Sequence, residues 1–256
     1  MIWIASYPRS GNTFLRNIFF DTYGLESTSY PREGKHRNDV DYQITKTHEL
    51  PGLIPDLKPD DFVIYLVRDG RDAFVSNSFY GKNFLKSEAS LDEITYHQIM
   101  ANDGAFFGGW SANVVEWSKR ANFILRFEDL TTQPELWTNK IAEMLALATP
   151  DTEKIKSFTE LKNSIPKYGS GSNKGNQKDF VQHFFRKGKI GSYQSEMTPE
   201  HQKLYWRMHG DVMMQLGYSK NGEIKDFSQG EIQAKNTLAK TLLFQSERIK
   251  HKLKLR

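Results

Sequence analysis

The chain has 256 residues, of which 38% are hydrophobic and 26% are charged, and its net charge is +4. This composition fits one globular domain, or one domain with an appendage, and the mild positive excess suits anionic ligands such as nucleotides. The chain contains no cysteine, which excludes disulfides and thiolate metal sites, and no apolar run long enough to cross a membrane. A first strand beginning at residue 2 leaves no room for a signal peptide. We therefore expect a cytoplasmic protein, and we find no module that binds nucleic acid.

Residues 2–20 have the pattern of a strand, a polar turn and a helix. Residues 2–5 are apolar, residues 6–11 have turn composition, and apolar residues recur at helical spacing after Asn12. This order directs backbone N–H groups and the positive end of a helix dipole at an anion. Gly11 permits close approach of the backbone, and Arg9 adds a fixed positive charge. The loop therefore indicates a phosphate site, with further side-chain donors from Ser10, Asn12 and Thr13.

Apolar and amphipathic segments alternate along the rest of the chain. We predict strands over residues 43–46, 62–67 and 122–127, and helices over residues 73–80, 91–100, 110–120, 134–148, 151–161 and 199–216. Two polar, turn-rich stretches predict loops: residues 24–42, exposed over a site, and residues 166–179, which have little to bury. Strands alternating with helices predict an α/β fold with a parallel sheet flanked by helices. Ligands of such sheets bind beyond the carboxyl ends of the strands.

Arg68 and Ser76 form a second candidate phosphate site. Arg68 ends the most continuous apolar strand, and Ser76 follows eight residues later, about two helical turns away. A guanidinium at the mouth of the sheet and a hydroxyl on the next helix can reach one phosphate. The alternative is that Arg68 only pairs with Asp69 or Asp72 at the surface.

Three segments in order resemble the sulfotransferases that use 3′-phosphoadenosine-5′-phosphosulfate (PAPS). YPRSGNT resembles their 5′-phosphosulfate loop, YLVRDGRDAFVS their 3′-phosphate segment, and FFRKGKIG their RKGxxG segment. The resemblance covers residues 1–218 and implies a sulfotransferase domain with a P-loop-like parallel sheet. It implies PAPS as donor, PAP as product, and no required metal. The residues that it assigns to the nucleotide are Arg9, Ser10, Gly11, Asn12, Thr13, Phe14, Arg68, Ser76, Phe127, Phe158, Arg186, Lys187 and Gly188. A core position is an equally good interpretation of Phe127 and Phe158.

His48 is the candidate catalytic base. Sulfuryl transfer needs a base for the acceptor proton and a cation for the charge that develops on the leaving phosphate. The segment Lys46-Thr47-His48 resembles the family's KTH, in which the histidine faces the acceptor and the lysine stabilises the transferring group. Arg9 stands where many cytosolic members have a catalytic lysine; an arginine stabilises charge but does not give up its proton. Ser76 is implied to modulate the cation at the bridging oxygen.

The resemblance leaves the acceptor open between a hydroxyl and an amine, and between a small metabolite and a glycan. Polar loops favour a polar acceptor, whereas aromatic residues between 79 and 107 equally suit an apolar pocket. The segment after RKG lacks the family's dimerisation pattern, and the stretch between Arg9 and His48 is shorter than in phenol and steroid sulfotransferases. Two other functions remain as alternatives: a small-molecule kinase and a non-catalytic nucleotide-binding module.

Residues 219–256 have a different character and are predicted to be a basic, amphipathic, helical extension. Residues 235–256 carry seven lysine and arginine residues and one acid, Glu247. Four apolar residues recur on one helical face: Leu238, Leu242, Ile249 and Leu253. We favour packing of residues 230–256 on their own domain or on a second subunit; the alternative is binding to a membrane surface or another partner.

Overall fold

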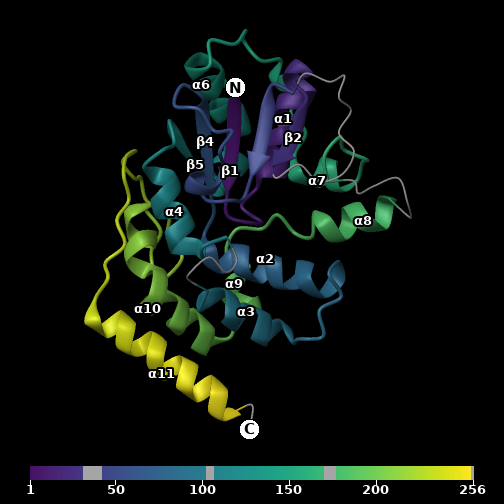
Figure 1. The fold of residues 1–256 in the computed structure, drawn as a ribbon. Helices are drawn as coiled ribbons and strands as arrows, with labels where there is room; N and C mark the ends of the chain where they lie inside the picture. Colours follow the sequence, from purple (N-terminus) through teal and green to yellow (C-terminus); the bar gives the residue numbers. More distant parts are fainter. Residues whose placement is uncertain (31–41, 102–106, 170–176, 255–256) are drawn as a thin grey trace.

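A five-stranded parallel sheet forms the centre of the protein (Figure 1). The structure is a computed structural model, and it describes residues 1–30, 42–101, 107–169 and 177–254. The strand order is β2-β3-β1-β4-β5, so the first strand lies in the middle. The predicted α/β class with a parallel sheet is confirmed. The strands are β1 (Ile2–Ser6), β2 (Ser27–Tyr30), β3 (Ile44–Thr47), β4 (Phe62–Val67) and β5 (Phe123–Arg126).

Helices connect the strands and continue after the last of them. Two are single 3₁₀ turns, η1 (Pro51–Leu53) and η2 (Thr152–Lys154). The α-helices are α1 (Asn12–Tyr23), α2 (Gly70–Asn83), α3 (Leu91–Ile99), α4 (Trp110–Ser118), α5 (Phe127–Thr132), α6 (Pro134–Met144), α7 (Phe158–Lys162), α8 (Gln177–Phe184), α9 (Tyr193–Glu196), α10 (Pro199–Gln215) and α11 (Leu238–Lys254).

Both faces of the sheet are buried, and β4 shows why its sequence is apolar throughout. Successive side chains of a strand point to opposite faces. Tyr65 and Val67 therefore join a core formed with α2, α4 and α10, whereas Ile64 and Leu66 join a second core formed with α1 and α6. A strand buried on both faces has no polar side to alternate with. This explains the continuous apolar run from which the strand was predicted.

The carboxyl ends of the strands meet at one edge of the sheet. In Figure 1 the strands run downward, and α2 lies across their lower ends. The segment that leads from α8 to α9 crosses the same region (Figure 1). Residues that follow β1, β3 and β4 are therefore brought together there, although they lie far apart in the sequence.

The predicted exposed loop over residues 24–42 is wrong at its beginning. Ser27–Tyr30 is a strand, paired in parallel with β3, and Ser27 and Thr28 are buried. Its hydroxyl side chains hid it, because an edge strand need not be apolar. Arg16 contributes to this burial by donating hydrogen bonds to the hydroxyl and the carbonyl of Ser27. The remainder of the predicted loop, from residue 31 to 41, lies outside the described residues.

Several predicted boundaries are also corrected. The helix expected over 151–161 is replaced by η2 and α7, because Ser157 and Glu160 form a capping box that starts a new helix. The strand expected to run to residue 127 ends at Arg126, where α5 begins. The loop expected to run to 179 ends where α8 begins, and residues 170–176 lie outside the described residues. The helix expected to end at 148 ends at Met144.

The chain after residue 218 returns to the domain before it forms α11. The Gln229 side chain accepts a hydrogen bond from the N–H of Ile124 and donates one to its carbonyl, so it covers the free edge of β5. Ile232 is buried in the core. α11 then packs through Leu243, which is 6% exposed, and not through the predicted apolar face, since Leu238, Leu242 and Ile249 point to solvent. The side chain of Leu253 lies outside the description.

Within the described ranges, no helix combines the length and the apolar composition needed to cross a bilayer.

Gly70 fits a tightly packed place at the start of α2. A methyl group added there would lie 2.0 Å from the Tyr205 hydroxyl oxygen and 2.9 Å from the Trp110 ring. We expect Gly70→Ala to lower the free energy of unfolding by about 1–3 kcal/mol, as overpacking does in other cores. The measurement is urea unfolding followed by circular dichroism.

Gly81→Ala on the same helix is the matched control. The nearest atom to the added methyl group would be Ile94 Cδ1 at 3.5 Å, an ordinary contact. Higher helix propensity should leave the free energy of unfolding unchanged or raise it by up to about 1 kcal/mol. Equal effects of the two substitutions would contradict the packing assigned to Gly70.

Candidate active site

The loop between β1 and α1 has the backbone geometry of an anion cradle. Arg9 and Gly11 both have positive φ, of 65° and 101°, which turn the chain sharply before the helix. Such a conformation is unusual for a residue with a side chain. The Ser10 hydroxyl is buried and has no hydrogen-bond partner. Gly11 lies against the Phe127 ring, where a side chain would collide with it.

Arg9 reaches from this loop toward α2 and α8. Its Nε donates to the Ser76 hydroxyl at 3.2 Å, and its Nη2 donates to the Phe184 carbonyl at 2.6 Å. The guanidinium lies 4.5 Å from the centre of the Phe184 ring. Burial, followed by the charges of Arg68 and Arg186, lowers the Arg9 pKa to about 10, so the group stays charged at neutral pH. No acidic side chain within the described ranges is paired with it.

Arg68 lies next to this loop, immediately after β4. It donates to the Arg9 carbonyl at 3.3 Å and to the Lys189 carbonyl at 3.1 Å. Its guanidinium covers the Phe127 ring at 4.5 Å. Asp72 is 3.8 Å away, so the predicted alternative of an ion pair with Asp72 is present, but the pair is buried. The Nε of Arg68 is buried without a partner, which leaves one donor for a ligand.

The first turn of α2 holds the surrounding segments in place. Asp69 caps the helix by accepting from the N–H of Arg71, and it also pairs with the Arg71 guanidinium. Asp72 accepts from the N–H groups of Gly191 and Tyr193, at 2.7 and 2.8 Å. These bonds fix the chain that follows Gly188 against α2. The carboxylates of Asp69 and Asp72 therefore hold the start of α2 and the segment before α9 in place.

Arg186 and Lys187 lie beside the site, but both bind Glu196. Arg186 forms two hydrogen bonds with the Glu196 carboxylate, at 2.7 and 2.8 Å, and Lys187 adds a third at 2.5 Å. These bonds, led by those from Arg186, hold the Glu196 pKa below its ordinary value. The Arg186 Nε is buried and has no partner. Glu196 was not among the residues predicted from the sequence, because nothing local marks it.

Two of the three predicted nucleotide aromatics, Phe14 and Phe158, pack in the same core, and the third, Phe127, lies against Gly11 and Arg68. Phe14 and Phe127 are almost fully buried, and Phe158 is partly buried. The rings of Phe14 and Phe158 are 6.2 Å apart, and Gly188 packs directly on Phe158. Phe14 and Phe158 also belong to the core formed with α1. Their role toward a nucleotide stays a prediction.

His48 follows β3 at the same edge of the sheet. Its Nδ1 lies 2.8 Å from the carbonyl oxygen of Ser6, the last residue of β1. A carbonyl only accepts, so Nδ1 carries the hydrogen and Nε2 carries the lone pair. Burial, then the charge of Lys46, lowers the His48 pKa to about 3, against a smaller opposing effect of the Ser6 bond. The imidazole is therefore neutral at physiological pH.

Asn113, which the sequence did not single out, binds the backbone of His48, and Phe107 contacts its ring. Asn113 on α4 donates to the His48 carbonyl at 3.1 Å and accepts a bond from the Tyr65 hydroxyl at 2.9 Å. Phe107 places its ring 5.5 Å from the imidazole. Phe106, another of the aromatic residues between 79 and 107 that suit an apolar pocket, lies outside the described residues. No pattern in the sequence pointed to this role, because only the fold shows that Asn113 is buried.

Lys46 and Thr13 complete the predicted set. Lys46 lies on β3, paired in register with Ile4 of β1, and its charge acts on His48. Thr13 and Asn12 begin α1, and the Asn12 amide donates to the Ser6 hydroxyl at 3.1 Å.

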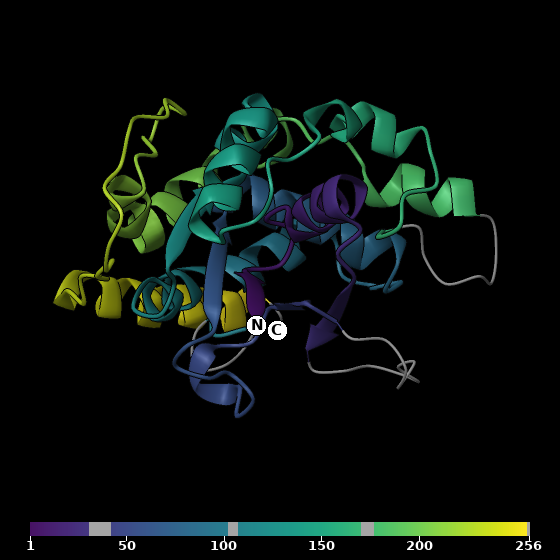
Figure 2. The ribbon, with the colours of Figure 1, turned by 90° about the horizontal axis from the view of Figure 1, so that it is seen from above.

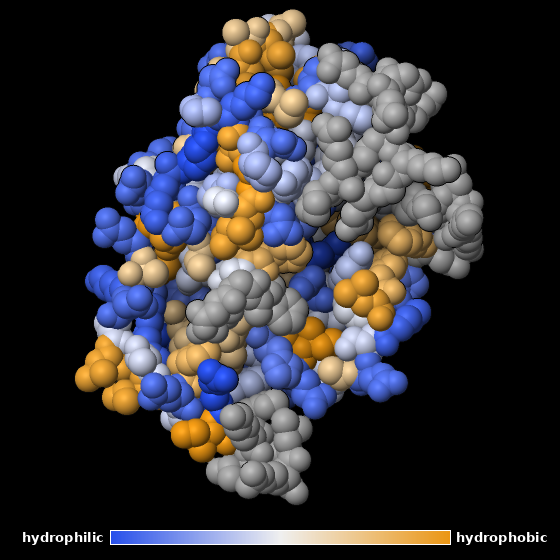
Figure 3. Space-filling model, viewed as in Figure 1, coloured by the Kyte–Doolittle hydropathy of each residue, from blue (hydrophilic) through white to orange (hydrophobic). Residues whose placement is uncertain are grey.

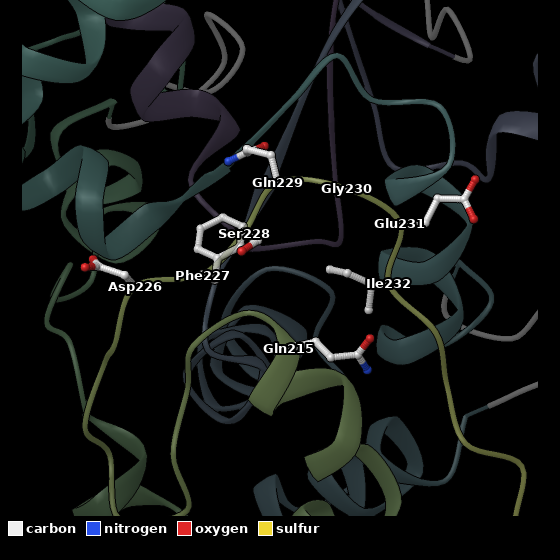
Figure 4. A pocket seen from close by; sticks show the side chains of 8 residues that line it. All are labelled: Gln215, Asp226, Phe227, Ser228, Gln229, Gly230, Glu231 and Ile232. Atoms are coloured by element: carbon white, nitrogen blue, oxygen red, sulfur yellow. The ribbon is translucent and has the colours of Figure 1, made fainter.

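A separate shallow cavity of about 490 Å³ lies away from these residues (Figure 4). It lies between the end of α10 and the segment after residue 225, and it contains none of the predicted site residues. Its lining is formed by Gln215, Asp226, Phe227, Ser228, Gln229, Gly230, Glu231 and Ile232.

Comparison with known proteins places the chain in a family. The family model described as the sulfotransferase domain matches residues 22–217. The chain belongs to the sulfotransferase family. This confirms the resemblance on which the sequence analysis relied, and the enzyme class, over the kinase and the non-catalytic module.

Curated relatives and solved structures agree with this assignment. Cytosolic sulfotransferase 13 of Arabidopsis thaliana is 26% identical over 77% of this chain and 72% of its own length. Human sulfotransferase 2A1 is 26% identical over 83% and 85%, respectively. The structure of mouse sulfotransferase SULT7A1 in complex with PAP shares the fold, with a TM-score of 0.68 and 19% identity over 96% of this chain and 88% of that chain.

Glu128 of this sulfotransferase is a buried carboxyl group that contacts the residue after Arg68. It accepts from the N–H of Asp69 at 3.0 Å and from the Tyr218 hydroxyl at 2.7 Å. Burial raises its pKa to about 7 from an ordinary 4.5. Between these pH values the folded protein keeps a proton that the unfolded chain releases. The contribution of Glu128 to stability is therefore lost as the pH rises through this window.

We expect Glu128→Gln to remove this pH dependence. Between pH 5 and pH 8 the wild-type free energy of unfolding should fall by about 1–3 kcal/mol more than that of the variant. Glutamine retains an acceptor for the Asp69 N–H, so the fold should persist. Urea unfolding at a series of pH values measures the difference, and parallel profiles would contradict a raised pKa at Glu128.

Proposed function

We propose that this sulfotransferase moves a sulfuryl group from PAPS to a hydroxyl or amine of a small metabolite or glycan, with His48 as the base. One observation carries the proposal. A histidine with a fixed tautomer, its Nε2 lone pair available, lies at the same sheet edge as a loop that contains Arg9 and is bonded by Arg68. That is the pairing of a base with cations that sulfuryl transfer requires.

The residues present fit an anionic nucleotide. Three buried donors in the predicted nucleotide segments have no partner: the Ser10 hydroxyl and the Nε atoms of Arg68 and Arg186. Buried polar groups without partners are rare unless a ligand or water satisfies them. The charges of Arg68 and Arg186 both act on Arg9, and the repulsion among three guanidiniums favours an anion between them. The complex of mouse SULT7A1 with PAP supports a nucleotide of this kind.

The predicted residues would divide among three parts of the donor. The loop and first turn of α1 would hold the phosphosulfate, α2 and the segment after α8 the 3′-phosphate, and the aromatic residues the adenine. The phosphosulfate residues would be Arg9, Ser10, Gly11, Asn12 and Thr13. The 3′-phosphate residues would be Arg68, Ser76, Arg186, Lys187 and Gly188. The adenine residues would be Phe14, Phe127 and Phe158.

Bound PAPS supplies an activated sulfuryl group on a phosphosulfate bond. His48 takes the proton of the acceptor at Nε2 as the acceptor oxygen or nitrogen bonds to sulfur. Lys46 and Arg9 stabilise the negative charge on the sulfuryl group and on the departing phosphate oxygen. The Ser76 hydroxyl orients Arg9 by accepting from its Nε. Arg9 keeps its proton, so this enzyme stabilises its leaving group by charge and not by proton donation.

The acceptor would enter beside His48, where Phe107 and Leu50 form part of the surroundings. Leu50 packs on Gly108, next to Phe107. These side chains suit an acceptor with an apolar portion next to its nucleophile. The names of the cytosolic relatives support a cytoplasmic place of action.

His48→Ala should lower kcat by about 10²–10⁴, because a general base contributes that much. Affinity for PAP should change less than about threefold, since His48 does not belong to the proposed nucleotide set. Steady-state assays with PAPS and a model phenol or sugar acceptor, together with calorimetric titration of PAP, test both parts. Full activity of the variant would eliminate His48 as the base.

The pH dependence of the wild type gives an independent check. With a His48 pKa near 3, protonation of His48 should not lower the wild-type kcat/KM as the pH falls through 6.5. A fall in kcat/KM near pH 6.5 that is absent from His48→Gln would contradict this expectation.

Arg68→Ala should weaken binding of PAP far more than binding of ADP, which lacks the 3′-phosphate. A lost charge-assisted hydrogen bond costs about 1.5–3 kcal/mol, which corresponds to roughly 10- to 150-fold in Kd. Calorimetry with both nucleotides measures the ratio, and Lys119→Ala, at an exposed residue immediately after α4, is the control. Equal losses for PAP and ADP would refute the 3′-phosphate assignment.

A further inference from the structure

The excess positive charge of the chain is confined to its end. Residues 235–256 contain seven of the 35 lysine and arginine residues but one of the 31 acidic residues. The remaining residues, 1–234, therefore have a net charge of −2, although the whole chain has +4. Charge separated in this way indicates a segment with an anionic partner of its own.

The orientation of α11 is fixed by contacts on its inner side. Leu243 is buried, Lys240 pairs with Asp211 of α10 at 2.6 Å, and the Tyr96 hydroxyl of α3 donates to the Glu247 carbonyl at 3.0 Å. The opposite side of the helix is consequently a defined surface of the folded protein.

That outer surface carries a row of aliphatic side chains that is interrupted by the exposed Gln245. Leu238, Leu242 and Ile249 are 75%, 56% and 59% exposed. Helical spacing places Arg248 and Lys250 on either side of these residues, and both are exposed, although Lys250 also pairs with Glu247 at 2.6 Å. Figure 3 shows hydrophobic side chains along the lower left, where α11 lies in Figure 1. In Figure 2 the first turns of α11 extend beyond the rest of the molecule, so a flat surface can reach them.

We propose that this outer face of α11 binds an anionic lipid surface. An amphipathic helix binds in the plane of a bilayer when its apolar row enters the acyl boundary and flanking cations meet anionic headgroups. Nucleic acid would use the cations but would leave the aliphatic row in water. A second copy paired through the same face would bring two basic helices together, and their like charges would repel. An anionic bilayer satisfies both the aliphatic row and the charge.

The test is sedimentation of the full chain with vesicles of phosphatidylcholine, with and without phosphatidylserine. We expect binding to the phosphatidylserine vesicles, weakened by added salt, and little binding to phosphatidylcholine alone. The double variant Leu242→Glu/Ile249→Glu should lose at least about tenfold in affinity. Leu136→Glu, at an exposed leucine of α6, should bind as the wild type does.

A second pair of variants separates charge from apolar contact. Arg248→Gln/Lys250→Gln should weaken binding about 30-fold, at roughly 1 kcal/mol for each cation near an anionic surface. Lys119→Gln/Lys154→Gln, two exposed lysines elsewhere, should leave it unchanged. Thermal unfolding of every variant verifies the fold. We expect unchanged unfolding temperatures, because all of these side chains are exposed.

Three outcomes would overturn the proposal: no binding to phosphatidylserine vesicles, equal loss in the control variants, or equal binding to neutral vesicles. Sedimentation velocity without lipid tests whether a second copy of the chain binds this face. A dimer that Leu242→Glu/Ile249→Glu dissociates, in a chain that ignores vesicles, would assign the face to a second copy. None of these results depends on the proposed sulfuryl transfer.

Discussion

The side chain of Arg68 holds the active-site end of this protein together. Its guanidinium bonds the carbonyl groups of Arg9 and Lys189, covers the ring of Phe127 and lies near Asp72. A buried guanidinium is costly unless its hydrogens are bonded and its charge is matched. The first loop, α2, α5 and the segment before α9 must therefore all be in place for Arg68 to make these contacts, and its Nε still has no partner. One charged residue at the end of β4 thus couples four parts of the site to the sheet.

Charges at this end of the sheet have two separate tasks. Asp69 and Asp72 accept from backbone N–H groups and from arginine, and so they hold the scaffold. Arg9 has no acidic partner among the described residues, and its positive charge is left for a ligand. His48 is kept neutral by burial and by nearby cations, and a main-chain carbonyl, not a carboxylate, sets its tautomer. The candidate site therefore combines positively charged guanidinium groups with a neutral imidazole.

Much of the fold was predictable because apolar runs are local signals. β4 and the strand–loop–helix around Gly11 are determined by consecutive residues, and their place at the carboxyl ends follows from parallel topology. β2 was missed because an edge strand built of serine, threonine and tyrosine looks like a loop. The helix predicted over 151–161 failed because Ser157 caps a new helix within it. The first error arises where composition hides a strand, and the second where a capping box outweighs the periodicity of a segment.

The sequence by itself determined the family and the order of the three segments that resemble it, because these depend on neighbours in the chain. Only the tertiary structure decided which partner each side chain has. His48 meets the Ser6 carbonyl, and Arg186 meets Glu196. It also decided that α11 packs through Leu243 and leaves Leu242 in solvent. Helical periodicity finds the residues that share a face of a helix, but the position of the rest of the protein decides which face is buried.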